Sequence, residues 1–251
     1  MLPYKKISKI FQESLKPVLP PIAICITKNI PEGVPNFKGS APAGCVFWQE
    51  AAKGPIATLT KDHEMCAIGV HTHNLANPSG SYKKNLGTLL EIMDSLHYVK
   101  KEDLLQIPVL EQETKVVVYS PLSETPLLPD VVLIFVNSRQ GLVIAEAVQQ
   151  LETAVPPVLG RPACAIVPQV INNDQAALSL GCCGARAYLD TFSDDITLWA
   201  LPGKKLMHYA DRIMNLTKAN ETLTVFHSIR RRDVEAGLEP TIVESLSQTK
   251  I

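Results

Sequence analysis

Two apolar runs rich in β-branched residues, 115–119 and 131–136, constrain the fold of this chain more than any other feature. A strand with one solvent-exposed face alternates apolar and polar residues, whereas a strand buried on both faces is apolar almost throughout. We therefore expect both runs to form strands in the middle of a sheet whose two faces are covered.

Shorter signals predict further strands and helices around these two runs. Strands are predicted at 22–27, 56–60, 176–180 and 196–201. Helices are predicted at 7–15, 46–53, 81–96, 141–151 and 203–215, most of them from apolar residues at helical spacing. The expected fold class is α+β, a single compact domain (1–251) around a mixed sheet, with a polar C-terminal tail at 238–251.

Composition argues against several classes of protein. Hydrophobic residues make up 46% of the 251 residues, as in ordinary folded proteins, and 24 Lys+Arg balance 25 Asp+Glu. Because there is no positive excess, nucleic acid is not an expected partner. The apolar runs are far shorter than the roughly 20 residues of a membrane-spanning helix, and the N-terminus lacks the features of a secretory signal. We expect a cytoplasmic protein that does not enter a membrane.

The cysteines show a recurring arrangement. Structural disulfides are rare in a reducing compartment, so six cysteines favour metal ligation or thiol chemistry. Pro-Ala-Gly precedes Cys45, and Cys66 follows 21 residues later; Pro-Ala precedes Cys164, and Cys182 follows 18 residues later. This recurrence suggests an internal duplication, which would bring the four thiols together if the halves pack face to face. The implied halves are 20–110 and 115–216.

Four thiolates suit either a tetrahedral zinc site or an iron-sulfur cluster. Structural zinc sites are usually built from cysteines separated by two to four residues, and this sequence has no such pair. Cluster ligands can instead come from dispersed loops beside glycines, where the backbone approaches the inorganic sulfides. We therefore predict a four-iron four-sulfur cluster on these thiolates, with Gly69, Gly181 and Gly184 in the cofactor-binding loops.

Two polar residues near these cysteines are candidates for catalytic roles. His63 lies three residues before Cys66, so a helical turn would place both side chains on one site, and we predict it to be a proton donor. Arg186 supplies a fixed cation that we predict binds an anionic group of the cofactor or substrate. The expected chemistry is electron transfer or reduction of a small molecule. No nucleotide-binding motif is visible, so electrons would come from a separate donor; a homo-oligomer is an open option.

Two other interpretations stay open. The first is a module that binds haem or another tetrapyrrole, with His63 or a cysteine as axial ligand and Arg186 paired with a propionate. The second is a metal-free thiol redox protein in which Cys182 and Cys183 cycle between dithiol and disulfide. Cys25 lies in a predicted strand and is interpreted as a small core residue.

Short motifs spread from Pro20 to about Pro202 also carry a family resemblance. In order they are Glu32-Gly33-Val34-Pro35, Cys45 with Gly54, His63-x-x-Cys66-x-x-Gly69, Val118-Tyr119-Ser120-Pro121-Leu122, Pro129-Asp130-Val131-Val132-Leu133, Cys164, and Ser179-Leu180-Gly181-Cys182-x-Gly184-x-Arg186. Their order and spacing resemble the uncharacterised family called domain of unknown function 169, found mainly in anaerobic and other prokaryotes. The resemblance implies that one site uses the positions of Cys45, His63, Cys66, Cys164, Cys182 and Arg186. It implies no activity or substrate, and it leaves Cys25 and Cys183 outside the pattern.

Overall fold

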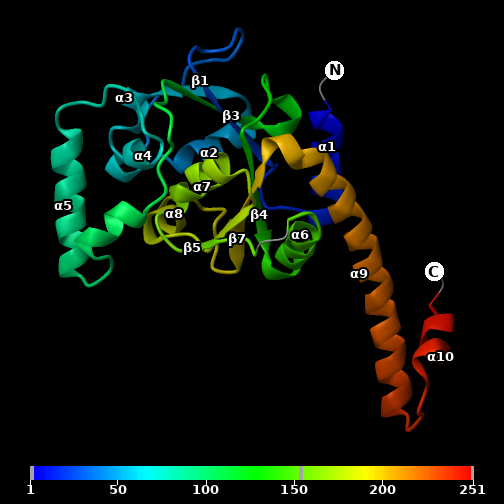
Figure 1. Ribbon diagram of the computed structural model, residues 1–251. Coiled ribbons are helices and arrows are strands. Elements are labelled where there is room, and N and C mark those ends of the chain that lie inside the picture. The colour runs from blue at the N-terminus through cyan, green and yellow to red at the C-terminus, as the bar shows by residue number, and fades with distance from the viewer. Residues whose placement is uncertain (1–2, 153–154, 250–251) are drawn as a thin grey trace.

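The computed structural model describes residues 3–152 and 155–249, which form a layered structure around a seven-stranded mixed sheet (Figure 1). The strand order is β2-β3-β1-β4-β7-β6-β5; β5 and β6 are parallel, and the other neighbours are antiparallel. The strands are β1 (Ile22–Thr27), β2 (Ile56–Leu59), β3 (Val116–Pro121), β4 (Val131–Asn137), β5 (Val158–Leu159), β6 (Ala177–Ser179) and β7 (Ile196–Pro202). The predicted α+β fold is confirmed.

Helices cover both faces of this sheet. One face carries α1 (Tyr4–Leu15), α6 (Ser138–Leu151) and the first turns of α9 (Leu206–Glu235). The opposite face carries α2 (Val46–Glu50), α4 (Ala67–Thr72), α7 (Ile166–Asn173) and α8 (Cys183–Tyr188). The remaining helical segments are η1 (Ala51–Lys53), α3 (Thr60–His63), α5 (Tyr82–Ser95), η2 (Lys101–Gln106), η3 (Leu122–Glu124), η4 (Ala163–Ala165), η5 (Gly203–Lys205) and α10 (Ile242–Ser247).

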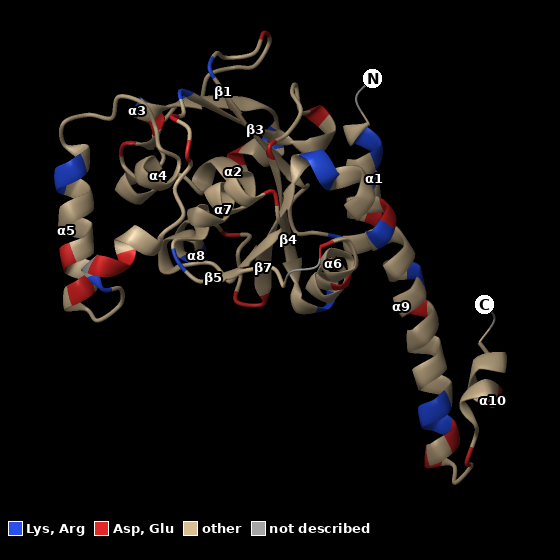
Figure 2. Cartoon of the chain, viewed as in Figure 1, with Lys and Arg blue, Asp and Glu red and all other residues tan. Residues whose placement is uncertain are grey.

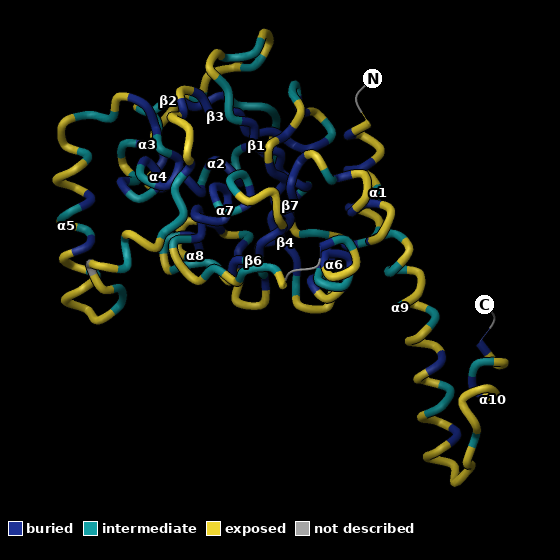
Figure 3. Tube along the Cα trace, in the orientation of Figure 1, coloured by how far each residue is buried: buried dark blue, intermediate teal, exposed yellow. Residues whose placement is uncertain are grey.

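Strand β4 shows why its run is apolar at every position. Alternate side chains of a strand point to opposite faces, so a strand between two helical layers needs apolar residues on both sides. Residues Val131, Leu133 and Phe135 pack with α2 and α7, whereas Val132, Ile134 and Val136 pack with α1, α6 and α9. Every residue of β3 is likewise buried, and Figure 3 shows the strands as the buried centre of the molecule. The two runs therefore form inner strands, as predicted.

The order of elements repeats on the two sides of the sheet centre. Outward from the central antiparallel pair β1 and β4, the strands run β1-β3-β2 on one side and β4-β7-β6 on the other. A cysteine-bearing turn and a helix, α2 or α7, precede the third strand of each set along the chain. The structure thus groups β1, β2 and β3 in one set and β4, β6 and β7 in the other. The predicted halves, 20–110 and 115–216, and their origin by duplication stay predictions.

One insertion breaks this repeat. Between α4 and β3 the chain forms α5 and η2, whereas the matching connection between α8 and β7 contains only residues 189–195. We call residues 82–108 the arm. It rests on α4 through a small apolar cluster of Ala67, Leu86 and Leu90, and Figure 1 shows α5 standing at the edge of the molecule.

The C-terminal region differs from its prediction. Helix α9 is 30 residues long, not the predicted 203–215, and its second half leaves the compact body (Figure 1). Figure 2 shows basic residues followed by acidic ones near its end. The predicted polar tail contains α10, because Thr241 and Glu244 form a reciprocal cap at its start; residues 250–251 lie outside the described chain. No helix of the described residues is long and apolar enough to cross a membrane.

Candidate functional site

The four predicted cysteine ligands line a single cavity of about 720 Å³. The cavity lies between the arm and the turns that begin α2, α4, α7 and α8. Its cysteines are Cys45, Cys66, Cys164, Cys182 and also Cys183. All five are free thiols. The fold brings Cys45 and Cys183 to one cavity although they are 138 positions apart in the sequence (183 − 45).

Each thiol is placed by the start of a short helix. Cys45 directly precedes α2, and Cys164 lies in η4, which leads into α7. Cys66 directly precedes α4, and Cys182 directly precedes α8. The cysteines thus form two matched pairs. Cys45 and Cys164, the first pair, each precede the third strand of their half, and Cys66 and Cys182, the second pair, each follow it.

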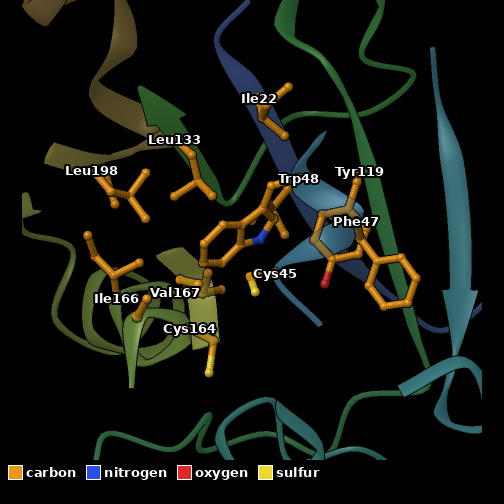
Figure 4. Packing of buried hydrophobic residues seen from close by; sticks show 14 of the residues in the cluster. Ile22, Cys45, Phe47, Trp48, Tyr119, Leu133, Cys164, Ile166, Val167 and Leu198 are labelled. Carbon is orange, nitrogen blue, oxygen red and sulfur yellow. The ribbon is translucent and has the colours of Figure 1, made fainter. Parts of the chain in front are cut away.

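The apolar core holds the first pair in position. Cys45 and Cys164 are each 7% exposed and belong to the main core cluster. Figure 4 shows Cys45 beside the indole of Trp48 and Cys164 next to Val167, with both sulfur atoms directed away from Ile22 and Leu133. Tight packing therefore restricts where these two sulfurs can move.

Burial and mutual proximity make these thiols weak acids. Burial, followed by the nearby thiols of Cys66 and Cys182, raises the pKa of Cys45 to about 12. The pKa values of Cys66 and Cys164 are also raised, again mainly by burial and then by neighbouring thiols. A buried thiolate needs compensating positive charge, so these sulfurs stay protonated unless a cationic group binds them.

Several donors point at the sulfur atoms. The backbone N–H of Ala185 lies 3.5 Å from the sulfur of Cys182, and the hydroxyl of Thr72 lies 3.4 Å from that of Cys164. The backbone of Gly44 and Gly69 beside Cys66 lowers the pKa of its thiol and so opposes part of the effect of burial. Such donors stabilise negative charge on sulfur, as is typical around metal-bound thiolates.

The three glycines predicted in the cofactor loops have different surroundings. A Cβ at Gly69 would lie 3.0 Å from the sulfur of Cys66, so this thiol occupies the space that a side chain would fill. Gly184 lines the cavity. Gly181 has φ +84° and faces Phe192, whose ring would be 2.9 Å from an added Cβ. Gly181 therefore serves the packing of its loop.

His63 does not line the cavity, although we predicted a proton donor there. It is buried behind Gly44, between the rings of Phe47 and Tyr119, and its Nε2 is 2.8 Å from the hydroxyl of Thr58. Burial holds its pKa well below the usual value, so the ring is neutral. A side chain enclosed in this way supports the turn that carries Cys45.

Arg186 also lies outside the cavity lining. Its guanidinium stacks on Phe192 at 4.6 Å and donates hydrogen bonds to backbone carbonyl oxygens of its own loop. The acceptors are the carbonyls of Leu180, Phe192, Ser193 and Ile196. A guanidinium engaged in this way holds the loop after Cys182 in shape, and its predicted anion-binding role stays a prediction.

The cavity has a cation that sequence reasoning missed. Arg161 lines it and lies over the ring of Tyr98, 3.7 Å from the ring centre, while donating a hydrogen bond to the carbonyl oxygen of Tyr98. The side chain of Cys183 beside Tyr98 raises the pKa of the Tyr98 hydroxyl. The one sequence signal was local: Arg161 directly precedes the Pro-Ala-Cys turn. Its contact with the arm spans 63 residues, which no local pattern predicts.

Among the described residues, no three or more His, Cys, Asp or Glu side chains converge on a position for one metal ion.

Comparisons with known proteins give one match. The family described as uncharacterised ArCR, domain of unknown function 169, matches residues 10–212, which include every cysteine of the cavity. Neither a search of curated proteins nor a search of solved structures found a match. The matched segment ends within α9, so it covers the whole sheet and both matched pairs of cysteines. This chain belongs to the domain of unknown function 169 family.

Proposed function

We propose that this protein holds a four-iron four-sulfur cluster through four cysteine thiolates, one from each helix start around the cavity. The ligands are Cys45, Cys66, Cys164 and Cys182. The observation that carries the proposal is that four dispersed thiols, two from each half of the sheet, line one cavity. A thiol-lined pocket with an N–H donor to sulfur has the chemistry that iron-sulfur clusters use.

The other cofactor considered, haem, fits these residues less well. Haem needs one or two axial ligands and would leave most of the four thiols without a role. His63, the imidazole predicted as its ligand, is enclosed behind the cavity wall. A cysteine remains available as an axial ligand, so the visible spectrum distinguishes the two cofactors.

Cys182 and Cys183 are adjacent, and Cys183 has the weaker case as the fourth ligand. It is exposed and lies beside Tyr98, whereas Cys182 accepts an N–H from its own helix and raises the pKa of both Cys45 and Cys66. We assign the fourth ligand to Cys182. The bound cluster would transfer electrons to a small molecule in the cytoplasm, where thiols stay reduced, and a separate protein would supply the electrons.

The test is metal analysis of the full chain, purified and reconstituted without oxygen. We expect about four iron and four sulfide per chain with a broad visible spectrum. Serine at any one of the four ligands should remove most of the iron. Cys25→Ser and Cys183→Ser are matched controls, because Cys25 is buried on the other side of the sheet and Cys183 lines the same cavity.

Three results would refute the proposal. The first is a colourless protein that stays free of iron after reconstitution. The second is full iron content in both Cys45→Ser and Cys164→Ser. The third is a sharp Soret band without bound sulfide, which would identify haem as the cofactor.

A further inference from the structure

The wall of the cavity opposite the thiols is apolar and comes from the arm. Leu89, Leu90 and Met93 of α5 line it, followed by Ile107 and Pro108 after η2. The volume of about 720 Å³ falls within the roughly 300–1,000 Å³ of small-molecule sites. The cavity therefore has room for an apolar molecule beside the thiols.

The charged side chains of this cavity differ in how far other residues already use their hydrogen-bonding groups. Of the described lining residues, only Arg161 and Asp103 carry charge. The Asp103 carboxylate accepts the backbone N–H of Lys100 and so caps η2. Arg161 uses one donor on the Tyr98 carbonyl, and no carboxylate of residues 3–152 and 155–249 forms an ion pair with it. A guanidinium has five N–H donors in a planar fork, so Arg161 retains donors for an anionic ligand.

We propose that the cavity binds a small apolar carboxylate, with its apolar body against α5 and its carboxylate on Arg161. The arm occurs in only one half of the repeated structure, and it adds apolar residues to the cavity that the thiols line. Binding of the carboxylate rests on the arm and Arg161 and not on the proposed cluster.

Arg161 also connects the two walls of the cavity. Its guanidinium stacks on Tyr98 from the arm, and it directly precedes the turn that carries Cys164. A carboxylate on this guanidinium would therefore lie at the junction of the apolar wall and the thiols. Bidentate pairing with arginine favours a planar carboxylate over a neutral group of similar size.

The test uses 2-naphthoate as the probe and isothermal titration of the anaerobically reconstituted full chain. We expect one probe per chain, and weaker binding of the neutral analogue 2-naphthamide. Arg161→Gln should weaken 2-naphthoate binding on the order of tenfold and remove its advantage over the amide. Arg139→Gln is the matched control, because Arg139 is an exposed arginine at the start of α6 on the opposite face of the sheet.

A second pair of variants tests the apolar wall. Met93→Trp places a larger side chain in the cavity and should abolish probe binding. Ile92→Trp, on the neighbouring position of α5 that is 50% exposed, should leave binding unchanged. Absence of naphthoate binding to the native chain would overturn the inference. Binding as strong as that of the native chain in both the Arg161→Gln and the Met93→Trp variants would also overturn it.

Iron and sulfide assays on the same samples separate this inference from the proposed function. Probe binding that depends on Arg161 in a protein without iron would sustain the carboxylate site and refute the cluster. A full cluster without probe binding would sustain the cluster and refute the carboxylate site.

Discussion

Acid should destabilise this protein through His73, the residue that ends α4. Its ring is fully buried, and its Nδ1 lies 3.1 Å from the carbonyl oxygen of Gly69, so Nδ1 carries the hydrogen and donates it. Nε2 has no hydrogen-bond partner among the described residues. Protonation would therefore place a charged N–H without an acceptor in the core, next to the neutral ring of His63 at 6.0 Å.

The size of the effect follows from the pKa. Burial lowers the pKa of His73 from its usual 6.5 to about 4. Because the folded-state pKa lies below the unfolded-state value, the unfolded chain binds the proton first as the pH falls. Stability is fully present above pH 6.5 and is lost toward pH 4, by about 3 kcal/mol for this one residue.

Urea unfolding of the metal-free protein between pH 7.5 and pH 4 measures this loss. His73→Asn keeps a donor for the Gly69 carbonyl but removes the titrating ring. We expect the variant to be less stable at pH 7.5 and to approach the native protein by about 3 kcal/mol at pH 4. His208→Asn, at an exposed histidine of α9, is the control. A constant difference between native protein and the His73 variant across this pH range would refute the reasoning.

Three further substitutions test other parts of the structure. Gly203→Ala should cost more than about 4 kcal/mol in urea unfolding, because its Cβ would lie 1.6 Å from the carbonyl oxygen of Pro129; unchanged stability would contradict this packing. Gly69→Ala should lower the reconstituted iron content by displacing the Cys66 sulfur, whereas Gly87→Ala, with open space at its Cβ, should keep it; equal iron in both would argue against Cys66 as a ligand. Arg186→Gln should cost about 2 kcal/mol of stability yet keep both iron and 2-naphthoate binding, and loss of probe binding from a stable variant would support its predicted anion-binding role.

The sequence predicts those parts of the fold in which burial leaves a local pattern of apolar residues. Apolar runs and helical spacing predicted the inner strands, helices α1, α2, α5 and α6 and the start of α9, because alternate residues of a strand and every third or fourth residue of a helix share an environment. The length of α9 was missed, since its second half leaves the body and carries no apolar stripe facing a core. Pairing of β3 with β1 is a long-range contact, so no local pattern predicts it.

The four cysteines predicted to share a site line one cavity, whereas His63 and Arg186 do not line it. Cysteines at the starts of helices share a recognisable turn, Pro-Ala-(Gly)-Cys, so their common placement left a signal in the sequence. His63 and Arg186 have suitable chemistry, but whether such a side chain faces a cavity or its own backbone depends on tertiary packing. Arg161 does line the cavity, but the sequence did not predict it because its partner Tyr98 comes from the arm.

The matched halves and the unmatched arm suggest how the proposed chemistry is divided. Ligands supplied in two equivalent pairs suit a cluster, whose metal atoms each need one thiolate and whose core can sit between the halves. A symmetric site of this kind presents similar surfaces on both sides and offers little basis for selecting a substrate. The arm removes that equivalence, since it adds an apolar wall and brings Tyr98 to Arg161 on one side only. We therefore expect substitutions in the arm to change which molecules bind while leaving iron content intact, and substitutions in the matched turns to change both.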